Sequence, residues 1–248
     1  MGLSGIGYRC GRMAQYSFRS AFVKKIGHRL SRIFNTGHGA EEFMIADLKR
    51  IGIEVYGEQE SITGFAGHWK GHIDGRCIGV IESPKTEHLV EFKTMNDKSF
   101  KDTVKKKVKA SKPGYYDQMQ AYMGYLKLTR ALFMAYNKND SSYYIERVKF
   151  DSERFAQLKE KELIILEESP VARIGNPITW FECKFCDARD LCMDNVKPVV
   201  SCRTCQHVDI LDEGKWECSR TQLNLTLQDQ ANGCSSYRKS DFFTASSS

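Results

Sequence analysis

The sequence predicts an α/β protein: a mixed central sheet flanked by helices, followed by a small cysteine-rich metal-binding region. Three observations support this fold class. The apolar spacing between residues 14 and 166 predicts the order helix, helix, strands, helix, strands, helix. Hydrophobic residues fill 41% of 248 positions, enough for a substantial core, and seven of nine cysteines lie from residue 183 onward. We therefore expect a core over 1–195, a zinc-ribbon-like tail over 196–240, and a disordered, frayed end over 241–248.

The predicted elements follow from these spacings. Apolar residues recur every four positions from Ala14 to Asn35, which predicts an amphipathic helix that Asn35-Thr36-Gly37 should end. A second helix carries Glu41 and ends near Gly52. The rest of the core is predicted as strands over 53–56, 61–66, 69–74, 78–81 and 89–93, a helix over 115–128, strands over 131–136 and 143–150, and a helix that Asp151 or Ser152 caps and that runs to Leu166.

Three polar residues of the strand-rich part form a candidate catalytic group. Alternate residues of a strand face the same way, so Glu91 and Lys93 should project together. Asp74 precedes Gly75, and the turn residues at 83–85 allow the chain to fold back as antiparallel strands that bring Asp74 beside Glu91. Two carboxylates are the ligands that Mg²⁺ prefers, and such an ion promotes phosphodiester hydrolysis. Taken alone, Glu91-Phe92-Lys93 is more typical of a solvated strand face.

The pattern around these residues resembles the PD-(D/E)XK nuclease superfamily, in its RecB-like branch. Gly71-His72-Ile73-Asp74-Gly75 followed by Glu91-Phe92-Lys93 is similar to its D…ExK motif, although Ile73 stands where the family has proline. Glu41 is similar to the family's helical metal ligand and is preferred over Glu42 from its spacing. Gln118 and Tyr122, one helical turn apart, are similar to the Q-x-x-x-Y motif.

This resemblance implies a role for each matched residue. Mg²⁺ or Mn²⁺ would be held by Glu41, Asp74, Glu91 and the Phe92 carbonyl. Lys93 would orient the attacking water or stabilise the transition state. Gln118 and Tyr122 would position the scissile strand. The activity implied is that of a DNA exonuclease in recombination, repair or phage DNA metabolism.

A first cysteine set has the spacing C-x2-C-x5-C. With the distant Cys10, it resembles the iron-sulfur staple of the AddB-type and CRISPR-associated RecB-like nucleases, which implies a [4Fe-4S] cluster on Cys10, Cys183, Cys186 and Cys192. Zinc accepts the same four sulfurs and remains the alternative. Either metal would join the two ends of the domain.

A second cysteine set follows it. One C-x2-C pair and two single cysteines predict a Zn²⁺ site on Cys202, Cys205, Cys218 and Cys234, with His207 as a possible substitute ligand. Disulfides are the less favoured alternative for an intracellular chain. Cys77 is predicted to be a buried strand residue without a metal.

The densest charge lies between residues 96 and 113. Its lysines can neutralise phosphates without reading sequence, and they follow the Glu91 strand directly; the alternative is an ordinary solvated loop or helix face. We expect this segment to be mobile without DNA. The predicted DNA-binding residues are Lys98, Lys101, Lys105, Lys106, Lys107, Lys109 and Lys112.

The overall composition limits the possible partners. The net charge is +6 and the pI is near 8.8, values that suit a polyanion such as DNA. No apolar run approaches ~20 residues and the N-terminus lacks the apolar stretch of a signal peptide, so we expect a cytoplasmic protein without membrane contact. Recombination or CRISPR-type partner proteins are a further expectation, and the oligomeric state stays open. Two other functions stay open: a catalytically silent DNA-binding adaptor and a structure-specific endonuclease.

Overall fold

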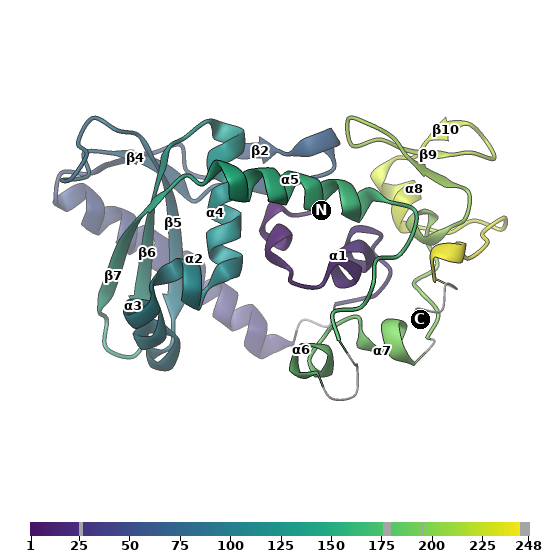
Figure 1. Cartoon of the computed structure of the whole chain (residues 1–248), viewed down its shortest axis with the longest axis horizontal. Helices are drawn as coiled ribbons and strands as arrows, with labels where there is room; N and C mark the ends of the chain where they lie inside the picture. The colour runs from purple at the N-terminus through teal and green to yellow at the C-terminus, as the bar shows by residue number, and fades with distance from the viewer. Residues whose placement is uncertain (25–26, 176–179, 195, 244–248) are drawn as a thin grey trace.

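The computed structural model describes residues 1–24, 27–175, 180–194 and 196–243. Its centre is a five-stranded mixed sheet in the order β1-β4-β5-β6-β7 (Figure 1). Within this sheet β5 and β6 pair in parallel, and the other neighbours are antiparallel. This agrees with the predicted mixed sheet flanked by helices. The strands are β1 (Glu54–Tyr56), β4 (Gly75–Ile78), β5 (His88–Met95), β6 (Arg130–Asn137) and β7 (Tyr143–Lys149).

Each face of this sheet packs against different helices. Val90 and Phe92 of β5 share a buried cluster with Met44 of α2, whereas Leu89 shares a cluster with Met119 of α4. Figure 1 accordingly shows α2 behind the sheet and α3 and α4 in front of it. The helices of this part are α2 (His28–Arg50), α3 (Asp97–Ser111), α4 (Pro113–Leu126) and α5 (Ser152–Leu166). None of the helices in the described residues is long and apolar enough to cross a membrane.

The expected helix over 14–35 is wrong. The chain forms α1 (Gly11–Phe18), leaves the helix at Ser20 with φ 50°, and begins α2 at His28. The expected break at Asn35-Thr36-Gly37 does not occur either, because α2 continues through it. The Thr36 hydroxyl donates to the Arg32 carbonyl at 2.9 Å, so this polar side chain finds its partner within the continuing helix.

Two strand predictions also need correction. The segments near 61–66 and 69–74 form a separate hairpin of β2 (Ser61–Thr63) and β3 (Lys70–His72), joined by the 3-10 turn η2 (Phe65–Gly67). The strand expected over 78–81 lies earlier, as β4. The helix expected to end at Leu166 is confirmed as α5, with the Asp151 carboxylate capping it by accepting from the Arg154 N–H at 3.0 Å.

The remaining elements lie at the two ends of the chain. They are η1 (Leu3–Gly7), α6 (Phe181–Lys184), α7 (Arg189–Met193), η3 (Cys202–Thr204), β8 (Val208–Ile210), β9 (Trp216–Cys218), β10 (Leu223–Asn224), α8 (Leu227–Ala231) and η4 (Asp241–Phe243). A small sheet, β10-β9-β8, joins three of them. Figure 1 places this small sheet beyond α5, on the opposite side of the molecule from the main sheet. The residues expected to fray, 241–248, include η4, and the last five of them lie outside the described residues.

Candidate active site

Asp74 and the strand β5 form the centre of the candidate site. The antiparallel register pairs Gly75 with Val90, so Asp74, the residue just before β4, lies next to Glu91. The Phe92 N–H donates to the Asp74 carboxylate at 2.7 Å, which fixes that side chain against β5. Lys93 forms an ion pair with Glu91 and donates to the Phe92 carbonyl at 3.1 Å. The three residues that the sequence singled out therefore meet at one place.

Glu91 is a fully buried carboxylate in a charged setting. Its side chain is 0% exposed, and the Gln118 amide donates to its Oε2 at 3.2 Å. Burial raises the pKa of Glu91 to about 7; Lys93 opposes this rise and the negative charge of Asp74 adds to it. Burial lowers the pKa of Lys93, but the negative charges of Glu91 and Asp74 raise it by more than burial lowers it. The net pKa is therefore above the ordinary value, and Lys93 remains an ammonium.

Glu41 approaches the same group from α2. It is partly buried, whereas its neighbour Glu42 is exposed. Burial first and the charge of Asp74 second raise the pKa of Glu41, and His38 and Lys93 lower it. Glu41 therefore shares an electrostatic environment with Asp74 and Lys93.

The first turns of α4 cover the other side of β5. Gln118 contacts Glu91, and Tyr122 is 2% exposed. Burial, followed by the charges of Glu91 and Asp74, raises the pKa of Tyr122 to about 12, so its hydroxyl stays protonated. A side chain at Gly71 would lie 2.7 Å from the Tyr122 hydroxyl, so only glycine allows this approach.

Sequence reasoning assigned no role to Tyr115, which contributes to the site. Its ring lies 5.2 Å from the Lys93 ammonium, in a cation–π contact. The signal was present, because Tyr115 precedes Gln118 by three residues and so shares its helical face.

Among the described residues, no group of three or more His, Cys, Asp and Glu side chains is already arranged to hold a metal ion. The metal-binding character predicted for the chain is therefore not seen directly. The donor chemistry of this site nevertheless suits a hard divalent cation, because three carboxylates supply oxygen ligands. The charge of Asp74 raises the pKa of both Glu41 and Glu91, and the Lys93 ammonium lowers both.

The predicted lysine segment is the helix α3. The Asn96 side chain caps it by accepting from the Ser99 N–H at 2.9 Å, and Lys107 interrupts it with φ 63°. Lys101 and Lys106 pair with Asp97 at 2.8 Å and Asp102 at 2.7 Å, and Lys109 pairs with Asp151 at 3.3 Å. Four of the seven lysines line an open groove of about 610 Å³: Lys98, Lys101, Lys105 and Lys112.

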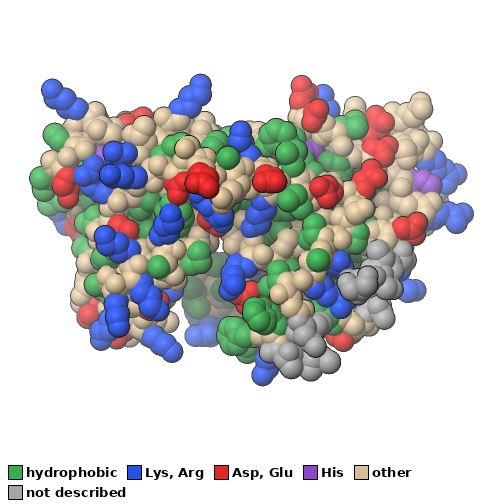
Figure 2. Space-filling view, viewed as in Figure 1, with side chains coloured by type: hydrophobic (Ala, Val, Ile, Leu, Met, Phe, Trp, Pro, Cys, Tyr) green, Lys and Arg blue, Asp and Glu red, His purple; other side chains and the backbone are tan. Residues whose placement is uncertain are grey.

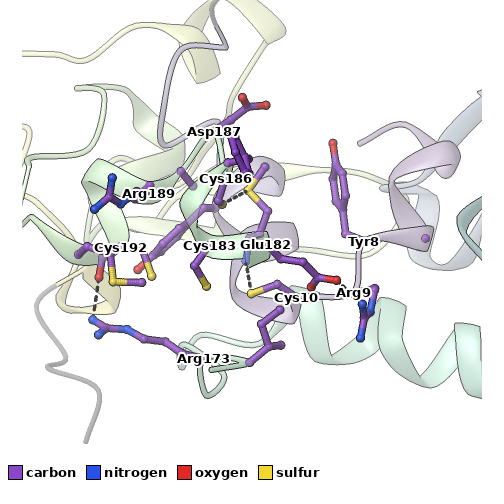
Figure 3. Close-up of a pocket in the computed structure, with 17 residues that line it drawn as sticks. Tyr8, Arg9, Cys10, Arg173, Glu182, Cys183, Cys186, Asp187, Arg189 and Cys192 are labelled. Carbon is purple, nitrogen blue, oxygen red and sulfur yellow. Dashed lines mark hydrogen bonds and ion pairs between the residues drawn. The ribbon is translucent and has the colours of Figure 1, made fainter. Parts of the chain in front are cut away.

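The first cysteine set surrounds one pocket of about 330 Å³ (Figure 3). Cys10 comes from the N-cap of α1, and the other members come from residues 183–192. Burial raises the pKa of Cys183, Cys186 and Cys192, and the charge of Cys10 adds to each rise. The structure therefore brings together thiols that are more than 170 residues apart in the chain.

Neighbouring contacts hold this junction closed. Arg9 pairs with Glu182, and Arg173 donates to the Cys192 carbonyl at 2.7 Å. The buried Arg12 donates to the Val171 carbonyl at 2.6 Å. Direct contacts between protein groups therefore join the N-terminal segment to the segment after α5.

The second cysteine set lines a different pocket, of about 230 Å³. All four predicted ligands and His207 contribute to it. Cys77 lies elsewhere, 0% exposed in β4, where burial raises its pKa to about 12. All nine cysteines are free thiols.

Comparison with known proteins defines the fold. No protein-family model and no curated protein matches the chain. Among solved structures, the chain is similar to LHK-Exo in complex with dAMP, with a TM-score of 0.51, 17% identity, and 67% of this chain and 85% of that chain covered. A second structure of LHK-Exo, described as an alkaline exonuclease from Laribacter hongkongensis, has a TM-score of 0.49 and 18% sequence identity. The match again covers 67% of this chain and 85% of that chain. A phage-related exonuclease from Haemophilus somnus has a TM-score of 0.40 and 17% sequence identity, and the match covers 62% of this chain and 76% of that chain. The first similarity shows that this chain shares the fold of LHK-Exo.

Proposed function

We propose that this chain is a Mg²⁺- or Mn²⁺-dependent deoxyribonuclease that acts as an exonuclease on DNA ends. The observation that carries the proposal is the meeting of Asp74, which directly precedes β4, with Glu91 and Lys93 in the middle of β5. The fold supports it, since the structure that shares it is named an exonuclease and was solved with a mononucleotide, dAMP. Exonucleolytic cleavage releases products of that chemical class.

In this proposal Glu41, Asp74, Glu91 and the Phe92 carbonyl hold the divalent cation. When bound, the cation supplies positive charge that stabilises the phosphate in the transition state. Gln118 fixes the orientation of Glu91 by donating to its Oε2. Lys93, held between Glu91 and the ring of Tyr115, presents its ammonium to the scissile phosphate or to the attacking water.

DNA would approach over α3. Lys and Arg side chains gather over this helix on the face shown in Figure 2, where a hollow also separates the half with the sheet from the half with α6. Asn96, which lines the lysine groove, directly follows β5, the strand that carries Glu91 and Lys93. Lysines contact phosphates without reading bases, which suits an enzyme that processes ends of any sequence.

We also propose that Cys10, Cys183, Cys186 and Cys192 hold a [4Fe-4S] cluster, with Zn²⁺ as the alternative. Four thiolates satisfy either metal. Visible absorption of protein purified without oxygen separates the two, because zinc gives none. Its role would be structural: it would join the N-terminal segment to the segment after α5.

The nuclease proposal is tested on three matched DNAs: a linear duplex labelled at its 5′ ends, the same duplex labelled at its 3′ ends, and circular single-stranded DNA. We expect Mg²⁺- or Mn²⁺-dependent release of mononucleotides from the linear DNA, no cutting of the circle, and loss of release in Asp74→Asn. The control is Glu153→Gln, which removes an exposed carboxylate of α5.

The other outcomes identify the rival functions. Cutting of the circle that Asp74→Asn abolishes would indicate an endonuclease. Tight binding of all three DNAs by metal-loaded protein, without any cleavage, would indicate a DNA-binding adaptor and would overturn the proposal.

A further inference from the structure

The cysteine-rich tail contains a group of side chains that the proposed nuclease function does not use. Cys202, Cys205, Cys218 and Cys234 come from three separate segments: η3, the end of β9, and the chain after α8. They line one pocket together with His207, and no carboxylate of the described residues lines it. Thiols and an imidazole are the ligands that Zn²⁺ takes in structural sites, whereas Mg²⁺ and Ca²⁺ need oxygen donors.

Backbone hydrogen bonds hold the three segments in register. The Cys205 N–H donates to the Cys202 carbonyl at 3.1 Å, which closes the C-x2-C pair into one tight turn. The Cys202 N–H donates to the Asn232 carbonyl at 3.0 Å, which ties this turn to the segment that carries Cys234. Cys218 pairs with Val208 across β9 and β8, next to His207. Cys202, Cys205 and Cys218 are therefore placed by main-chain contacts, whereas Cys234 lies in an exposed segment in which the Tyr237 N–H donates to the Cys234 carbonyl at 3.0 Å.

The tail has few apolar side chains to stabilise it. Val200, Leu223 and Leu227 are 58%, 65% and 79% exposed. Trp216, at 2% exposed, is buried in the main core, and the partly buried Val208, Ile210 and Leu225 pack against that same core. A segment this short with so little apolar burial needs another source of folding free energy, and a structural metal is a common one.

The hairpin of β8 and β9 carries this tail onto the core. Trp216 lies 5.0 Å from the ring of Phe18 and 5.8 Å from the ring of His68. The His68 Nε2 contacts the Leu211 carbonyl at 2.6 Å, and the Gly214 N–H donates to the Ala66 carbonyl at 2.7 Å. The hairpin is therefore fixed to the core by ring packing and by hydrogen bonds.

The tightest approach in this region is between Gly67 and Gly214, both with positive φ. A side chain at Gly67 would lie 2.5 Å from the backbone of Glu213, so the hairpin tip fits only against glycine. This corner precedes β3, which leads to Asp74. The hairpin therefore supports the segment that positions a residue of the candidate site.

We propose that Cys202, Cys205, Cys218 and Cys234 form a structural Zn²⁺ site that holds the β8–β9 hairpin against the corner at Gly67 and His68. The cysteines close one end of the hairpin and the glycine contact closes the other. Zinc binding would thereby order the tail and restrain the chain that leads into β3. That second effect matters for Asp74 only if the proposed nuclease function holds; the metal site does not depend on it.

The first test is metal content of the full chain, purified under reducing conditions. We expect tightly bound zinc, and a loss of one equivalent in Cys202→Ser/Cys205→Ser. Cys77→Ala is the matched control, because it removes a thiol that belongs to neither cysteine set and should leave that equivalent in place. Replacement by Co²⁺ should give the visible spectrum of tetrahedral thiolate coordination, unchanged in His207→Ala.

The second test follows the hairpin itself. Hydrogen exchange at the amides from Gly67 to Trp69 should become faster in Cys202→Ser/Cys205→Ser, or after zinc removal from the intact chain, and should recover when zinc is returned to the latter. This reversal excludes simple misfolding of a variant.

Three results would overturn the proposal: reduced intact protein that binds neither Zn²⁺ nor Co²⁺ through the tail, an unchanged zinc content in the double variant, or retention of the Co²⁺ spectrum in Cys234→Ser with its loss in His207→Ala. Zinc binding without any change in exchange would remove the role at the Gly67 corner. None of these measurements depends on DNA cleavage, so the nuclease proposal can fail separately.

Discussion

Two buried glutamates, Glu91 in β5 and Glu162 in α5, have the same perturbed pKa in different surroundings. Their exposed fractions are 0% and 1%, and burial raises the pKa of each to about 7. Glu91 faces other charges: an ion pair with Lys93 and the negative charge of Asp74. Glu162 accepts from two neutral donors, the Tyr125 hydroxyl at 2.5 Å and the Phe65 N–H at 3.2 Å.

The difference shows what a shifted pKa can and cannot identify. Burial is the largest cause at both residues, so the shift itself marks only a dry environment. Clustered charges distinguish the candidate site, because several like charges are brought together only at a cost in stability. Glu162 instead holds the first residue of η2, Phe65, in place, which is a structural task.

The largest expected effect is that of Lys93→Met. This change removes the ammonium that pairs with Glu91 and that is the proposed source of positive charge at the phosphate. We expect cleavage of linear DNA to fall by about 100- to 1000-fold, the size of effect that follows removal of a single transition-state hydrogen-bond donor in other enzymes. The measurement is the rate of mononucleotide release at saturating Mg²⁺ or Mn²⁺.

Glu162→Gln is the control for this comparison. It removes a carboxylate that is as buried as that of Glu91 but whose hydrogen-bond donors are neutral. The cleavage rate of this variant should therefore stay close to that of the intact chain. Equal losses in both variants would show that burial, and not the cluster, is what matters.

The next effect separates two adjacent acids of α2. Glu41 shares the field of Asp74 and Lys93, whereas Glu42 is exposed. We expect Glu41→Gln to lower the cleavage rate by about 10- to 100-fold, a loss typical of weakened metal sites, and to raise the Mg²⁺ concentration needed. Glu42→Gln should change neither. A loss of cleavage in Glu42→Gln but not in Glu41→Gln would identify Glu42 as the metal ligand of α2.

The third effect concerns stability and pH. The folded-state pKa of Glu162 lies above the ordinary value of 4.5, at about 7, so the folded chain binds this proton more tightly than the unfolded chain. Its contribution to the free energy of unfolding therefore falls as pH rises from 4.5 to 7, by roughly 3 kcal/mol at most.

Glu162→Gln cannot lose that proton and should not show this fall. Denaturant unfolding at pH 5 and pH 8 checks it: the variant should gain about 1–3 kcal/mol on the intact chain between these values. Parallel pH profiles for the two proteins would mean that Glu162 titrates normally.

The smallest effect is expected from the lysines of α3. Lys98 and Lys105 line the groove and have no acid partner among the described residues, whereas Lys101 is paired with Asp97. Replacing Lys98 and Lys105 by Gln should weaken DNA binding a few-fold. It should also reduce the salt dependence of binding by about one unit of slope for each phosphate that the protein no longer neutralises.

A control with the same change in net charge is Lys127→Gln/Lys138→Gln, at two exposed lysines outside the groove. Binding to a short duplex, measured at several salt concentrations, compares the pairs. An equal loss of DNA affinity in the two double variants would show that net charge alone attracts DNA.

The local pattern of the sequence was sufficient to find the candidate site. The alternation of Glu91 and Lys93 was confirmed, because both project from one side of β5 and meet in an ion pair. Their catalytic role stays a prediction. The strand pairing is right in outcome but wrong in detail, since Asp74 lies outside both strands, two residues after β3 ends and one residue before β4 begins.

Long helices were harder to place from the sequence. The four-residue spacing from Phe18 to Phe34 predicts one helix, yet Phe18 is buried in α1 while Phe34 lies 48% exposed on α2. The spacing carried no information on where the chain leaves the helix at Ser20. The residues at 35–37 favour a break locally, but the helix continues because its C-terminal half packs on the sheet through Ala40, Met44 and Leu48.

The sequence by itself determined which residue types and spacings the protein has: Glu91 and Lys93 of β5 with Asp74 upstream, the two cysteine sets, and the Gln118 and Tyr122 face of α4. These are local features, and spacing of a few residues is enough to state them. The tertiary structure alone decided which distant residues meet. Cys10 faces Cys183, Trp216 packs on Phe18, and Gly67 touches Gly214, because burial of apolar surface and backbone contact select one arrangement of elements from many that the same local patterns allow.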